Sequence, residues 1–118
     1  MAETTPIPLR ELTTLRTGAA PERMLEAHTT DELLDALQQT WARGDEWFVL
    51  GGGSNLFAGD VAFEGTVIRV LTSGSEELAS PHEGRVRLRV QAGHSWDALV
   101  AYAVERGYAG IEAMSGIP

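Results

Sequence analysis

The sequence contains neither cysteine nor lysine, so its nine basic residues are all arginine. Without cysteine the chain can form no disulfide, no thiolate nucleophile and no cysteine-ligated metal site. Without lysine it cannot carry the P-loop motif, which requires a lysine after its last glycine. The 17 acidic residues bring the formal charge to −8, which disfavours nucleic acid and anionic membrane surfaces as partners. Any bound phosphate must therefore be held by local groups.

Long apolar segments are also missing. No window approaches the roughly 18 apolar residues that a membrane-spanning helix needs. The amino-terminal segment MAETTPIPLRELTTLRTG lacks the basic and apolar regions of a signal peptide. We therefore expect a cytoplasmic protein without membrane contact. The three histidines, His28, His82 and His94, lack the spacing of metal ligands, so we expect no metal site.

Residues 22–50 have the pattern of a strand, a helix and a second strand. ERMLEAH (22–28) predicts the first strand, and Thr29 followed by Glu32 predicts a capping box that opens the helix. Gly44 is a suitable end for this helix. WFVL (47–50) is apolar on both faces, which is typical of a buried parallel strand. One apolar stripe at helical spacing contains Leu33, Leu34, Leu37 and Trp41.

The second half predicts two strands and a helix. TVIRV (66–70) predicts a strand, residues 73–84 form a turn-rich connection, and RVRLRVQA (85–92) alternates as a half-buried antiparallel strand does. Ser95 can cap a helix that ends at Gly107, with Asp97 favoured in its first turn by the helix dipole. The apolar stripe of this helix is Trp96, Leu99, Val100, Ala103 and Val104.

These elements predict an α+β protein with a small parallel sheet. We expect Trp41, Trp47 and Trp96 to lie in the core. The three arginines of residues 85–92 are expected on a solvated strand face beside acidic residues, with contact to an anionic ligand or to a further domain as the alternative. They are Arg85, Arg87 and Arg89.

The most unusual stretch is VLGGGSNLF (49–57), in which three glycines follow an apolar strand. Consecutive glycines expose the backbone and permit positive φ, so successive N–H groups can surround an anion without a lysine. Ligands of open α/β sheets bind at the carboxyl ends of strands. The third position of a dinucleotide fingerprint is occupied by Leu56, and no crossover helix fits before the next strand. The alternative is a flexible turn.

Four segments together resemble the UDP-N-acetylenolpyruvoylglucosamine reductases, bacterial flavoenzymes of peptidoglycan precursor synthesis. The segments are LTTLRTGAAPERM (12–24), VLGGGSNLF (49–57), AGHSWDALVAYAVERGYAGIE (92–112) and SGIP (115–118). The resemblance implies an FAD-binding fold of the second, vanillyl-alcohol-oxidase-like type. Its small parallel sheet with helices is followed by the start of an antiparallel subdomain.

The resemblance also implies the cofactor site. FAD would be bound noncovalently, with its pyrophosphate in the glycine loop and a second cofactor-facing segment at the end of the chain. Arg16 is a further candidate for contact with an anion of cofactor or substrate. The implied site residues are Gly51, Gly52, Gly53, Ser54, Asn55, Leu56, Ala113, Ser115, Gly116, Ile117 and Pro118.

The family reduces the enolpyruvyl group of a UDP-sugar with NADPH as co-substrate. Its catalytic residues follow the SGIP segment, so no catalytic residue is assigned here. NADPH and the UDP-sugar would bind through regions beyond it. We therefore expect the amino-terminal part of a monomeric oxidoreductase: an extended segment (1–12), a first FAD-binding subdomain (13–72) and the start of a second (73–118).

Three alternatives remain. The chain could belong to a flavoenzyme of the same fold with another substrate, or be a non-catalytic nucleotide-binding module. It could also be a purely structural domain, in which the glycines serve stability alone. If the glycines hold FAD, replacing Gly52 and Gly53 by valine is expected to abolish binding while the chain stays folded.

Overall fold

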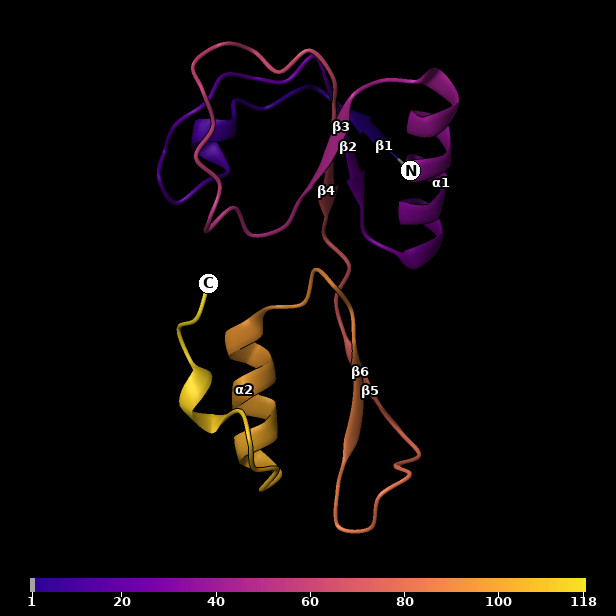
Figure 1. Cartoon of the computed structure of the whole chain (residues 1–118), viewed down its shortest axis with the longest axis vertical. Helices are drawn as coiled ribbons and strands as arrows, with labels where there is room; N and C mark the ends of the chain where they lie inside the picture. Colours follow the sequence, from indigo (N-terminus) through magenta and orange to yellow (C-terminus); the bar gives the residue numbers. More distant parts are fainter. Residues whose placement is uncertain (1) are drawn as a thin grey trace. The chain divides into compact units, whose positions relative to one another are not determined.

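The computed structural model describes residues 2–118, and the chain divides into two compact units, the first ending at Thr72 and the second spanning Ser73–Pro118. The first unit contains a four-stranded sheet in the order β1-β2-β4-β3 (Figure 1). Its strands are β1 (Ala2–Thr4), β2 (Arg23–Ala27), β3 (Trp47–Leu50) and β4 (Thr66–Val70). β4 pairs in parallel with both β2 and β3, whereas β1 pairs antiparallel with β2. The predicted α+β class and small parallel sheet are confirmed, and β1 is an addition within the segment expected to be merely extended.

Helix α1 (Thr30–Arg43) begins and ends as its sequence predicts. The side chain of Thr29 accepts the Glu32 N–H, and the Glu32 side chain accepts the Thr29 N–H, which completes the capping box. Gly44 follows the helix with a left-handed φ of 72°. α1 packs against β2 and β4, and the core on this face contains Leu25, Ala36 and Ile68 with Leu33 and Leu37 beside them.

The opposite face of the sheet is covered by loops and by the short 3-10 helix η1 (Leu9–Glu11) (Figure 1). The buried residues of this second core cluster are Leu9, Met24, Leu50 and Val67. β2 and β4 therefore contribute buried side chains to both faces. This is the arrangement expected of the middle strands of a parallel sheet.

Two tryptophans of this unit were predicted to lie in the core, and this prediction is wrong. Trp41 is 56% exposed and Trp47 is 39% exposed, and their rings pack edge to face at 6.0 Å. The physical reason is that β3 lies at the edge of the sheet, while α1 covers β2 and β4. Leu50 is the buried residue of β3, so the strand is not buried on both faces as its apolar sequence predicted.

The second unit contains a hairpin of β5 (Ser75–Leu78) and β6 (Arg87–Val90), followed by α2 (Trp96–Glu105) and the 3-10 helix η2 (Glu112–Met114). The sequence predicted β6 and α2 but placed β5 in a turn-rich connection, which is wrong. β5 has no apolar alternation, and its pairing with β6 is what makes it a strand.

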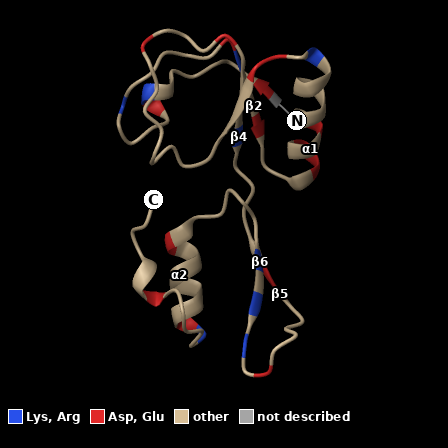
Figure 2. Ribbon diagram, in the orientation of Figure 1, with Lys and Arg blue, Asp and Glu red and all other residues tan. Residues whose placement is uncertain are grey.

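Charges of opposite sign lie next to each other on this hairpin (Figure 2). Glu76 stands opposite Arg89 in register, and their side chains form a salt bridge of 3.0 Å. Arg85, Arg87 and Arg89 are all exposed, which confirms the predicted solvated face. Leu99, Val100 and Ala103 on α2 are the buried apolar residues of this unit. Among the described residues, no helix is long and apolar enough to cross a membrane.

Candidate functional site

The glycine loop begins directly after β3, at the carboxyl end of the strand. Gly51 and Gly52 are both exposed. A Cβ atom added to Gly51 would have no neighbour within 4 Å, and one on Gly52 would meet only the Ser54 Oγ at 3.8 Å. Ser54 and Asn55 are exposed as well. The loop thus exposes backbone without side chains, together with two polar side chains, to solvent and to a ligand.

Gly53 has a different role from its two neighbours. It is buried, its φ is 70°, and an added Cβ would lie 2.0 Å from the backbone oxygen of Leu12. Its carbonyl oxygen accepts the Thr14 N–H at 3.0 Å. Gly53 therefore fastens the loop to residues 12–18. This corrects the expectation that valine at Gly53 leaves the fold intact, because the new side chain would overlap backbone.

The segment that Gly53 contacts carries Arg16. Arg16 is exposed and is the one non-glycine residue with positive φ, 57°, in the described chain. Its N–H donates to the Thr13 oxygen at 3.3 Å, which closes a tight turn. Three other arginines of this unit pair with carboxylates: Arg23 with Glu3, Arg43 with Asp45, and Arg69 with Glu26. Within residues 2–72, Arg10 and Arg16 have no such partner, so their charge remains available to an anion.

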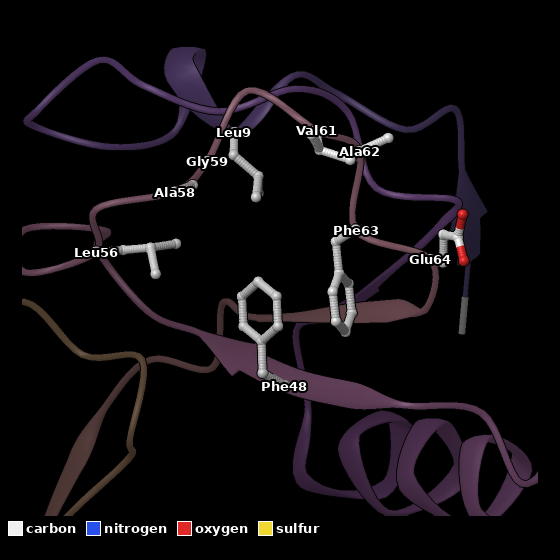
Figure 3. Close-up of a pocket in the computed structure, with 9 residues that line it drawn as sticks. All are labelled: Leu9, Phe48, Leu56, Ala58, Gly59, Val61, Ala62, Phe63 and Glu64. Carbon is white, nitrogen blue, oxygen red and sulfur yellow. The ribbon is translucent and has the colours of Figure 1, made fainter.

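Leu56 continues the glycine loop into an apolar pocket of about 610 Å³. The side chains of Leu56, Phe48 and Phe63 are directed into this pocket (Figure 3). Phe48 and Phe63 pack edge to face with ring centroids 5.0 Å apart. Leu9, Ala58, Gly59, Val61, Ala62 and Glu64 complete the lining. Such walls suit an apolar or aromatic group. The sequence shows that apolar residues follow the glycine loop. It does not show that they meet Phe48 around one pocket, because that depends on the fold.

The predicted segment at the end of the chain lies in the second unit. Ala113, Ser115, Gly116, Ile117 and Pro118 are all exposed. The Gly116 N–H donates to the Asp97 Oδ1 at 2.7 Å, and the Ser115 Oγ donates to the same oxygen at 3.1 Å. The Ile117 N–H donates to the Met114 oxygen at 3.3 Å. These two backbone donors are therefore used within the protein.

Trp96 and Asp97 form hydrogen bonds with this segment that the sequence analysis did not predict. Trp96 was predicted to lie in the core, but it is 38% exposed and its Nε1–H donates to the Met114 oxygen at 2.8 Å. Asp97 was noted only as a favourable charge in the first turn of α2. The sequence places Asp97 in the first turn of a helix, but it does not show which donors the carboxylate accepts.

Charged and polar side chains near these segments interact with backbone groups a few residues away or in a neighbouring loop. Backbone N–H groups of Glu112 itself and of Gly110 lower the pKa of the Glu112 carboxyl at the start of η2. The His94 Nδ1 lies 3.2 Å from both the Gly74 N–H and the Ser73 Oγ, in keeping with its predicted place at the entry of α2. Among the described residues, no group of His, Asp or Glu is arranged to hold a metal ion.

Comparison with known proteins adds to this geometry. The model of the FAD binding domain family matches residues 21–118. The UDP-N-acetylenolpyruvoylglucosamine reductase of Leifsonia xyli subsp. xyli is 56% identical over 115 residues, which cover 98% of this chain and 30% of that protein. The reductase of the same name from Cutibacterium acnes is 45% identical over 113 residues, covering 95% of this chain and 30% of that protein.

A solved structure is also similar. The UDP-N-acetylenolpyruvylglucosamine reductase from Thermus caldophilus superposes with a TM-score of 0.69 and 26% sequence identity. The match covers 99% of this chain and 39% of that one. The chain thus spans about 30% of the length of the curated relatives named above.

Proposed function

We propose that this chain binds FAD noncovalently as part of a UDP-N-acetylenolpyruvoylglucosamine reductase. The chain belongs to the FAD binding domain family and, within it, to these reductases. The observation that carries the proposal is the open backbone of Gly51 and Gly52 at the end of β3. It lies inside the matched region. Bare backbone at the carboxyl end of a parallel strand is where a pyrophosphate can approach N–H groups closely.

The residues around this loop fit the cofactor. Ser54 and Asn55 can donate hydrogen bonds to phosphate oxygens from their exposed side chains. Arg16, on the segment fastened to Gly53, can offset the charge of the pyrophosphate in a protein of net charge −8. The apolar pocket beside Leu56 can take an aromatic group.

The second part of the proposed site is the segment of Ala113, Ser115, Gly116, Ile117 and Pro118. Because the Gly116 and Ile117 N–H groups are used internally, its contacts to FAD would come from its other polar groups, such as the Ser115 oxygen, and from the exposed side chains. The two units would correspond to the first FAD-binding subdomain and the start of the second.

In the longer protein, bound FAD would carry a hydride from NADPH to the enolpyruvyl double bond of a UDP-sugar, a step of peptidoglycan precursor synthesis in the cytoplasm. The residues of this chain bind and orient the cofactor, and none is assigned to the chemical step. NADPH and the UDP-sugar would bind elsewhere in the polypeptide. We propose that the chain alone holds FAD as a monomer without turnover.

The test is visible absorption of the chain after incubation with FAD and removal of free flavin. We expect a retained and shifted flavin band that ADP displaces and FMN displaces poorly, because the adenylate half lies in this chain. Gly52→Val should weaken FAD at least about tenfold by covering open backbone. Ala42→Val, an exposed change of similar bulk on α1, is the matched control. A colourless protein, or equal retention by the two variants, would contradict the proposal.

A further inference from the structure

The end of the chain is held by hydrogen bonds from one turn of α2. Asp97 Oδ1 accepts from both Ser115 Oγ and the Gly116 N–H, and the Trp96 indole donates to the Met114 oxygen. Asp97 and Trp96 are adjacent, so a single turn of helix makes contacts on both sides of Ser115. These three hydrogen bonds join side chains of α2 to the segment.

We propose that Asp97 and Trp96 are positioning residues that pre-order residues 113–118 for FAD, an inference that rests on the proposed function. The segment itself has no buried side chain, because every residue from Glu112 to Pro118 is exposed. Burial therefore contributes little to fixing its backbone. Hydrogen bonds must supply the order that a preformed cofactor contact needs, and those to α2 add to the one from the Ile117 N–H to the Met114 oxygen.

The helix can supply this order because its own start is stabilised independently. The Ser95 Oγ accepts the Ala98 N–H at 3.3 Å, so the cap of α2 does not depend on Asp97. The Asp97 carboxylate is then free to point out of the helix. Within the described residues it forms no salt bridge, and its side-chain hydrogen bonds are those to Ser115 and Gly116. Hydrogen bonds to a charged acceptor are stronger than neutral ones.

Asp97 also limits how the segment can meet the cofactor. While the carboxylate accepts the Gly116 N–H, that donor cannot be given to a phosphate. Asp97 thus acts through the backbone of the segment and not by contact with FAD. Removing it would let residues 113–118 sample other conformations, and binding would then have to restore the order.

The experiment compares Asp97→Ala, Asp97→Asn and Trp96→Phe in the same chain. Glu105→Ala is the matched control, since it removes an exposed carboxylate from the opposite end of α2. Hydrogen exchange of residues 112–118 is measured without flavin, and the FAD dissociation constant is measured by flavin fluorescence. Asp97→Ala should speed exchange and weaken FAD, each about tenfold, as expected for loss of hydrogen bonds to a charged group.

The conservative variants identify the cause. Asparagine keeps an oxygen that can accept the Gly116 N–H but lacks the charge, so the FAD affinity of Asp97→Asn should lie between those of Asp97→Ala and the parent. Trp96→Phe should speed exchange near Met114 and weaken FAD several-fold, because it loses the donor but keeps an aromatic ring. Glu105→Ala should change neither quantity.

The outcomes separate the inference from the proposed function. Unchanged exchange in Asp97→Ala would overturn the ordering role. Faster exchange with unchanged FAD affinity would overturn the positioning role, while leaving FAD binding by the parent in place. If the parent chain binds no FAD, the proposed function fails, and the positioning role for FAD fails with it even where exchange becomes faster.

Discussion

At the scale of single residues, Gly52 and Gly53 are adjacent and chemically identical, yet their surroundings are opposite. Gly52 is exposed with open space where a side chain would be, whereas Gly53 is buried against the Leu12 backbone with a positive φ. Gly53 thus serves the fold, and Gly52 is available to a ligand. A run of glycines read as one motif therefore contains residues in two different environments.

This contrast leads to a stability prediction. Gly53→Ala should lower the free energy of unfolding by roughly 2–4 kcal/mol, from the cost of a left-handed non-glycine residue together with overlap with Leu12. Gly52→Ala should change it by less than about 0.5 kcal/mol, as exposed substitutions usually do. Urea unfolding followed by tryptophan fluorescence measures both. Equal midpoints for the two variants would show that the loop moves away from Leu12 without cost.

At the scale of elements, α1 depends on its capping box. Glu32 accepts N–H groups from His28 and Thr29, and the His28 N–H is the main cause that lowers the pKa of the Glu32 carboxyl. A lowered pKa in the folded state stabilises the fold above the ordinary glutamate value of 4.5. That stabilisation is lost as the pH falls through the lowered value.

Glu32→Gln tests this linkage. Glutamine keeps a side-chain oxygen for the capping box but cannot titrate. The stability advantage of the parent over the variant should be full at neutral pH and should shrink as the pH falls below about 4.5. Thermal unfolding between neutral pH and pH of about 3 measures it. An advantage that stays constant over this range would rule out the linkage.

At the scale of the whole molecule, the two units differ in how much they bury. Met24, Leu25, Val67 and Ile68 are completely buried, and all of them lie on β2 or β4. In the second unit the buried apolar residues lie on α2, while residues of β5 and β6 are exposed or half-buried. Local opening requires less free energy where fewer apolar side chains are buried.

We therefore predict that hydrogen exchange is slowest in β2 and β4. Amides of β5 and β6 should exchange at least about a hundredfold faster, because opening free energies within one protein range from near zero to the global value. Mass spectrometry of peptic peptides at neutral pH measures this. Slower exchange in the β5–β6 hairpin than in β4 would contradict this prediction.

Much of the fold was predictable because the responsible contacts are close in sequence. The capping box of α1, its end at Gly44 and the Ser95 cap of α2 all follow from residues within a turn of one another. The open glycine loop was predicted for the same reason, since it directly follows a strand. Its FAD contacts stay a prediction.

Tertiary structure decided everything that depends on which distant segments meet. β5 is a strand because β6 pairs with it, and Trp41 and Trp47 are exposed because β3 became the edge of the sheet. Gly53 has no room for a side chain because the Leu12 backbone packs on it, and Asp97 holds Gly116 from another element. The sequence by itself determined the local elements and the glycine loop, because backbone capping and side-chain periodicity act over a few residues. The partners of each surface were set only when the folded chain brought them within hydrogen-bonding and packing distance.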